Sequence, residues 1–234
     1  MFNLLKIETI KAKRFIPFYA MVLYWVPFLF YTSYGTVKKG VYLFSTHECF
    51  SECIQDMSLS FVFAILAAWF ISADFGNRTI MRSITTGSDR LKIIIAKLIP
   101  ASIFIILFHT VFTIADTIGF GIHLGFSGDG FCVNDIAWVA VVYLQAVALV
   151  SVFEFICFIC CNFYGAVLAC TMAAFVCCNI LRNYINAFWY DHSCFNFAES
   201  SSAADLIPCA VIAVITIAVM ITATYLVFRK RDVA

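Results

Sequence analysis

Four polar side chains recur inside one long apolar segment of this sequence, and they are the residues best placed to do chemistry. They are Ser102, His109, Thr113 and Asp116, within residues 98–121. Steps of seven, four and three residues place them on one face of a helix. Because polar groups in an apolar helix are costly, we interpret this face as a candidate translocation path or subunit interface.

A further polar candidate, Glu154, lies in the apolar segment 136–160. Two interpretations stay open for it: a role in transport, and a structural hydrogen bond between helices. Asp116 also has a second interpretation, because it falls near the end of its segment, at headgroup level. Arg182 lies at a similar depth and could pair with it.

Cys49 and Cys53, with His47 beside them, are a local group of metal-ligand and redox side chains. They could be free thiols, or a disulfide if their compartment oxidises thiols. A metal site is the third interpretation. No second cluster completes a tetrahedral set of ligands, so we predict no metal.

Catalytic motifs are missing from the sequence. It contains no GxxxxGK[ST] phosphate loop, no HExxH and no GxSxG. We therefore expect no enzymatic activity, no cofactor bound by this chain and no nucleic-acid partner.

The composition indicates which environment these residues occupy. Hydrophobic residues make up 63% of the 234-residue chain and charged residues only 12%, with a mean hydropathy of +0.96. So few charges cannot cover so much apolar surface in water. We predict an all-α integral membrane protein that forms a single transmembrane domain over residues 1–234.

Apolar segments of about 20 residues are needed to cross the hydrocarbon core as helices. We predict six such spans, at about residues 15–34, 59–73, 98–121, 136–160, 163–182 and 206–228. The fourth and fifth are nearly continuous, broken only near Cys161, Asn162 and Phe163, so we expect a tight helical hairpin there. Five spans would remain if this break were misread.

The charges indicate which side of the membrane each loop occupies. With six spans, 12 of the 15 Lys and Arg fall on one side, and most acidic residues fall on the other. Lys and Arg concentrate in the cytoplasm, so we predict that both termini are cytoplasmic. Residues 1–14 mix apolar and basic side chains, as in an interfacial amphipathic helix; a plain basic flank is the alternative.

Residues 74–97 form a basic loop between the second and third spans, with Arg78, Arg82, Arg90, Lys92 and Lys97. The pattern predicts a short helix, a turn at Gly87 and Ser88, and the start of a second helix. A loop organised in this way suits docking of a partner as well as connection.

This layout resembles the permease subunit of type-2 ABC transporters, in particular the small permeases of lantibiotic immunity and peptide export. The most specific matches to the family's cytoplasmic pattern are Asn77, Arg78, Thr79 and Ile80, then Ser88, Asp89 and Arg90, then Lys97 and Leu98. Asp74 stands at the family's acidic position. Arg78 departs from the pattern, because a small residue usually precedes the threonine. The basic ending at 228–232 also fits.

The resemblance implies that residues 79–86 form a coupling helix seated on a separate ATP-binding subunit, which holds ATP and Mg²⁺. Arg78 and Arg82 would contact its acidic groups, Ile80 and Met81 would fill its apolar groove, and Thr79 would begin the helix. A second permease subunit would complete the complex in a bacterial plasma membrane. The cargo would be a lantibiotic, another peptide, or a hydrophobic molecule.

Two other classes of function stay open. One is a stand-alone channel or secondary carrier, for which internal repeats and broken helices are the expected signs. The other is a membrane scaffold or sensor without transport, which the polar stripe disfavours.

Overall fold

The computed structural model describes residues 2–38, 46–56, 59–77, 79–85, 87–124, 133–177, 187–198 and 202–230. Every regular element in these ranges is a helix. In chain order the helices are α1 (Phe2–Lys13), α2 (Ile16–Lys38), α3 (Thr46–Ile54), α4 (Leu59–Gly76), α5 (Thr79–Thr85), α6 (Arg90–Leu124), α7 (Val133–Cys160), α8 (Phe163–Phe175), α9 (Ala187–Asp191) and α10 (Ala203–Lys230).

Four helices are long and apolar enough to cross a membrane. They occupy Leu59–Gly76, Arg90–Ile122, Asn134–Cys160 and Ala204–Lys230. Two shorter apolar helical stretches, Ile16–Phe28 and Phe163–Phe175, accompany them. The chain is thus an all-helical, multi-pass membrane protein, as its composition predicts.

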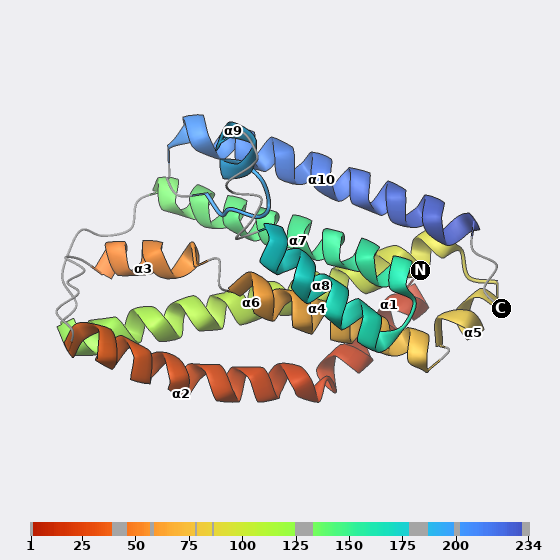
Figure 1. Ribbon diagram of the computed structural model, residues 1–234, viewed down its shortest axis with the longest axis horizontal. Helices are drawn as coiled ribbons and strands as arrows, with labels where there is room; N and C mark the ends of the chain where they lie inside the picture. Colours follow the sequence, from red (N-terminus) through yellow and green to blue (C-terminus); the bar gives the residue numbers. More distant parts are fainter. Residues whose placement is uncertain are drawn as a thin grey trace.

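Six helices run along the long axis of the molecule and alternate in direction: α2, α4, α6, α7, α8 and α10 (Figure 1). Helix α3 lies at one end, which we call the α3 end. Helices α1 and α5 lie at the opposite end, which we call the α5 end, together with the last turns of α10.

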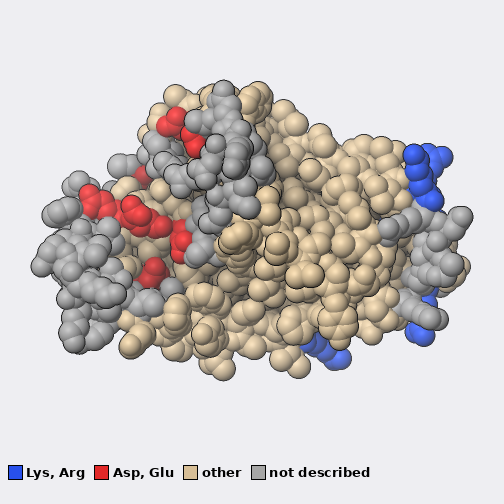
Figure 2. Space-filling view, in the orientation of Figure 1, with Lys and Arg blue, Asp and Glu red and all other residues tan. Residues whose placement is uncertain are grey.

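Charge differs between these two ends. Figure 2 shows basic side chains toward the α5 end and acidic ones toward the α3 end and α9. Exposed residues of the first kind include Lys13, Arg14, Arg82, Arg229 and Lys230. Those of the second kind include Glu48, Glu52, Asp191 and Asp205. The sorting of charge that the sequence predicts is therefore present in space.

The break between the fourth and fifth predicted spans is a helix terminus with a side-chain cap. Helix α7 ends at Cys160, and Cys161 adopts a φ of 51°. Asn162 caps α8, because its Oδ1 accepts a hydrogen bond from the Gly165 amide at 2.6 Å. The tight hairpin predicted here is confirmed. The end of the fifth predicted span, after residue 177, lies outside the described residues.

The turn after α5 is also the one that the sequence predicts. The Ser88 amide donates to the Ser83 carbonyl (3.0 Å), and the Gly87 amide donates to the Ile84 carbonyl (2.9 Å). This pair of bonds is a Schellman motif, which needs a left-handed residue after the helix. Gly87 supplies it with a φ of 84°.

The third predicted span is part of a longer helix. Its apolar region was expected from residue 98, but α6 begins at Arg90. Hydropathy marks where lipid begins, whereas a helix continues as long as its backbone hydrogen bonds do. Lys97 thereby becomes a helical residue rather than a loop residue.

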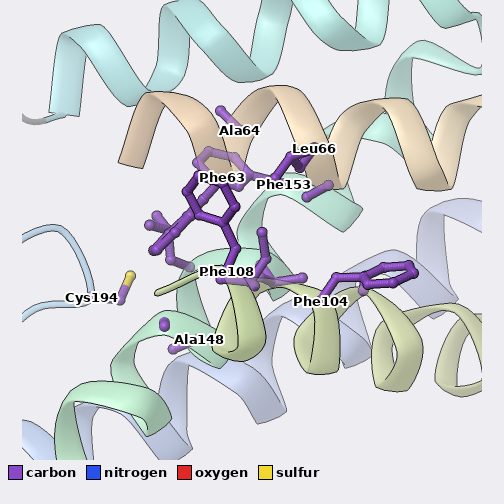
Figure 3. Packing of buried hydrophobic residues seen from close by; sticks show 14 of the residues in the cluster. Phe63, Ala64, Leu66, Phe104, Phe108, Ala148, Phe153 and Cys194 are labelled. Atoms are coloured by element: carbon purple, nitrogen blue, oxygen red, sulfur yellow. The ribbon is translucent and has the colours of Figure 1, made fainter. Parts of the chain in front are cut away.

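Large aromatic side chains fill the centre of the bundle. Phe63 of α4, Phe108 of α6 and Phe153 of α7 are almost completely buried. Figure 3 shows them meeting between the helices, with Cys194 from the segment after α9 close by. This core fixes the faces of α4, α6 and α7 that carry the polar residues.

Candidate functional site

Four charged side chains meet at the α5 end, three of them buried and one partly exposed; we call them the charge cluster. It consists of Lys97 of α6, Asp74 of α4, and Glu8 and Lys11 of α1. Lys97 is only 2% exposed. Its ammonium group contacts Asp74 and lies 3.2 Å from Glu8 Oε2. Lys11 lies 2.9 Å from Glu8 Oε1 and 3.0 Å from both Asp74 oxygens.

The charge cluster contains two cations and two anions, so each charge faces opposite charges. That balance matters because an unpaired buried ion is very costly. For Lys11, burial lowers the pKa, but the hydrogen bonds and charges of Glu8 and Asp74 outweigh burial and raise it. The cluster therefore ties α1, α4 and α6 together through ions that need one another.

Sequence reasoning did not find this cluster, although it noted Asp74 and Lys97 separately. The sequence predicts Lys97 at the end of a basic loop that includes the start of a second helix, and it places Glu8 and Lys11 in an interfacial helix. The only local sign was the spacing of Glu8 and Lys11, which face one another on a helix. Their pairing with Asp74 and Lys97 depends on which helices become neighbours.

Helix α5 lies beside the charge cluster. A small pocket there is lined by Leu4, Glu8, Asp74, Thr79, Ile80, Ser83, Ile93, Ala96 and Lys97. Ile80 is 2% exposed, so its own chain already covers it. This corrects the expectation that Ile80 fills a groove on a partner. Thr79 begins α5 and Arg82 is exposed, while Arg78 and the side chain of Met81 lie outside the described residues.

The polar face predicted on α6 points into the bundle. Ser102, His109 and Thr113 are 7%, 0% and 2% exposed. Glu154 of α7 is 1% exposed. Ser102 Oγ, His109 Nδ1, Thr113 Oγ1 and Glu154 Oε1 have no hydrogen-bond partner among the described residues. Buried polar atoms without partners are uncommon in native proteins, so the polar face of α6 together with Glu154, which we call the polar stripe, is a candidate for contact with water or a bound molecule.

His109 has a defined tautomer when its ring is neutral. Its Nε2 lies 3.0 Å from the carbonyl oxygen of Ile54, the last residue of α3. A carbonyl only accepts, so Nε2 carries the hydrogen and Nδ1 keeps a lone pair. The rings of Phe197, Phe63 and Tyr143 surround the imidazole, with centroids 5.4, 5.5 and 5.7 Å away.

Asp116 contacts α3 at the α3 end. The Cys53 thiol donates to Asp116 Oδ2 at 3.1 Å. A hydrogen bond with Cys49, burial and the Asp116 charge together raise the pKa of the Cys53 thiol. Both cysteines are reduced in the structure, and the disulfide stays a prediction for oxidising conditions. The pairing of Asp116 with Arg182 falls outside the described residues.

The segment of residues 193–198, which we call the inserted segment, penetrates the bundle after α9. Gln145 of α7 donates from Nε2 to the carbonyls of Ser193 (2.9 Å) and Asn196 (3.0 Å). Its Oε1 accepts from the Ala198 amide at 2.9 Å. The Trp138 indole donates to the Ala198 carbonyl at 2.6 Å. Sequence reasoning missed this insertion; Gln145 in an apolar helix was the available sign.

Metal ligation has little support in this arrangement. Within the described ranges, no group of three or more His, Cys, Asp or Glu side chains is placed to hold an ion. His47 instead lies 3.3 Å from Asp135 at the start of α7.

Comparison with protein-family models, curated proteins and solved structures finds no match for this chain. Its function must therefore be argued from the charge cluster, the polar stripe and the inserted segment.

Proposed function

We propose that the chain is the membrane-spanning permease subunit of an ABC-type transporter that moves a peptide or hydrophobic cargo. The energy would come from ATP hydrolysis on a separate subunit. The chain itself supplies the path through the membrane and the docking helix, and it has no nucleotide-binding motif of its own.

The observation that carries this proposal is the position of α5. This short helix lies at the basic end, between two long helices, with a Schellman motif at its end. Ile80 anchors it to its own chain, while Arg82 and Thr85 remain exposed. A helix that packs on its own chain on one side and is exposed on the other is suited to transmit a movement of a bound partner to the membrane helices.

The charge cluster would couple a movement of α5 to the helices of the membrane domain. Asp74 lies at the end of α4 and Lys97 lies in α6, so α5 is joined to the cluster from both sides. Glu8 and Lys11 bring α1 into the same unit. Closure of a partner on α5 would move these elements together and change the side of the membrane to which the proposed translocation path opens.

The proposal includes six spans, with α2 and α8 joining the four long apolar helices. Helix α2 has 23 residues, which is enough to cross about 30 Å of hydrocarbon. The α5 end would face the cytoplasm of a bacterial cell, because its exposed charges are basic.

Co-purification tests this function. The native membrane complex, isolated through an affinity tag on this chain, should contain an ATP-binding subunit. Reversal of charge by Arg82→Glu should reduce recovery of that subunit by about tenfold, since docking charges contribute strongly to complexes of this kind. Lys13→Glu reverses an exposed charge at the same end, away from α5, and should leave recovery unchanged. Absence of any ATP-binding subunit from the wild-type complex would refute the proposal.

A second candidate function, a stand-alone carrier or channel, is favoured by the polar stripe. From Ser102 to Asp116 it extends about 21 Å along α6, roughly two thirds of the thickness of the hydrocarbon core. Purified chain in lipid vesicles distinguishes the two. Flux of protons or ions without ATP or a partner supports the carrier, and flux only with the ATP-binding subunit supports the permease.

A further inference from the structure

The inserted segment reaches deep into the protein without being helical. Gln145, which binds it, lies about 18 Å along α7 from the first residue of that helix. Non-helical backbone at such depth is tolerated only where protein covers it or where it lines a cavity. Here Gln145 and Trp138 bind three backbone carbonyls and one backbone amide.

These contacts are of the kind that a protein uses to bind a peptide. Two side chains of α7 form hydrogen bonds with backbone groups of the segment. Because every peptide has these backbone groups, such bonds do not select a particular sequence. One side chain, Phe197, is seated in an aromatic pocket. Its ring lies 5.4 Å from that of His109, at an interplanar angle of 28°, and 6.4 Å from that of Phe63. In peptide recognition, hydrogen bonds to the backbone commonly provide affinity, and pockets for side chains provide specificity.

We infer that this cradle of Trp138, Gln145, His109 and Phe63 is a peptide-binding site, and that the inserted segment is its resting occupant. The cargo is a peptide that presents an aromatic side chain to the place of Phe197. A cargo peptide that carries a hydrogen-bond donor next to its aromatic ring would bind more tightly than the inserted segment does. It can donate to His109 Nδ1, which receives no hydrogen bond in the structure.

The inference deepens the proposed function, since it names the cargo class and the place where cargo binds. It rests on that function for its biological purpose. Peptide binding, however, needs neither ATP nor a partner subunit. Failure of the binding experiment would leave the permease proposal intact, and failure of co-purification would leave a peptide-binding membrane protein.

The test uses the full chain in lipid nanodiscs and a fluorescent hexapeptide with the sequence of residues 193–198, serine replacing its cysteine. The Phe197→Ala variant empties the aromatic pocket. It should bind the hexapeptide at least about tenfold more tightly than the wild type. Burial of an aromatic ring contributes enough binding free energy for at least a tenfold change in affinity. A control hexapeptide with alanine in place of the second phenylalanine should show no such gain.

Cys194 provides a second measurement that needs no variant. Its thiol is 3% exposed while the segment is inserted, so a maleimide should label it slowly. Excess phenylalanine hexapeptide should accelerate labelling of wild-type Cys194 at least about threefold, as expected when a buried segment spends more time outside. The alanine hexapeptide should not, and labelling of buried Cys157 should stay constant with either peptide.

Two results would overturn the inference. One is equal binding of the two hexapeptides to folded Phe197→Ala protein. The other is a labelling rate of wild-type Cys194 that neither hexapeptide changes. Either result would mean that the inserted segment only closes the bundle.

Discussion

Lys97 lies between the carboxylates of Glu8 and Asp74. The free energy of burying its ammonium group depends on both carboxylates. Charged groups can be removed from water at an acceptable cost only when opposite charges lie next to one another. The side chain also lies 5.8 Å from the Phe70 ring, a cation–π distance. This residue therefore reports whether the charge cluster forms.

Substitution Lys97→Met should lower the free energy of unfolding by about 3–5 kcal/mol, because two buried carboxylates then share one cation. Denaturant unfolding in detergent micelles would measure the change. Lys92→Met is the matched control, since Lys92 is exposed five residues earlier on α6, and it should change stability by less than about 0.5 kcal/mol. Equal effects of the two substitutions would contradict the buried cluster.

Lys11 gives the cluster a pH dependence at the alkaline limit. Its pKa is raised in the folded protein, because Glu8 and Asp74 outweigh burial. The stability that it contributes is fully present below its ordinary pKa of 10.5 and is lost as pH rises through the folded-state pKa. Lys11→Arg, which stays charged, should therefore retain thermal stability above that pH better than the wild type. Parallel alkaline profiles of melting temperature would show that Lys11 is not paired.

At the scale of elements, α5 is kept short by its C-terminal motif. Gly87 stands in the left-handed region, and a β-carbon there would meet nothing within 4 Å. The cost of a larger residue is thus conformational rather than steric.

The substitution Gly87→Ala should cost about 1 kcal/mol and loosen the last turn of α5. Hydrogen exchange of the Gly87 and Ser88 positions would measure this, since both amides donate within the motif. Gly76→Ala at the end of α4 is the control: it also has open space, but no left-handed backbone, and should not destabilise. Slow exchange in both variants would argue against the motif.

At the scale of the whole molecule, exposed charges of opposite sign at the two ends predict its orientation in a membrane. The α5 end carries exposed Lys and Arg, which resist translocation, and the α3 end carries exposed acids. If the α5 end faces the cytoplasm, as proposed above, the charge cluster and α5 would lie on the cytoplasmic side. Helix α3, at the opposite end of the molecule, would then lie on the other side.

Orientation can be measured in intact cells. We expect a membrane-impermeant thiol reagent to label Glu52→Cys at the α3 end and to leave Lys13→Cys at the α5 end unlabelled. Both positions are exposed, so burial does not distinguish them. Permeabilised cells, in which both should react, provide the control. The reverse pattern would invert the topology, and labelling of both in intact cells would indicate an even number of spans between them, so that α2 does not cross the membrane.

Much of the fold follows from local properties of the sequence. Hydropathy over some 20 residues identifies a membrane helix, and helical periodicity identifies the buried face of α6. Asn162 and Gly87 mark the ends of helices through their own backbone preferences. These properties depend on near neighbours in the chain, so they can be read without knowing which helices touch.

The tertiary structure decided what local properties leave open. Lys97 of a basic loop became the centre of a buried cluster because α1 and α4 pack against α6. Ile80, expected at a partner's surface, is covered by its own chain. Residues 193–198 enter the bundle because Gln145 and Trp138 satisfy backbone groups that lipid cannot. Sequence alone determined a helical membrane protein with sorted charges and a polar stripe; which charges pair, and what covers His109, depends on contacts between distant segments.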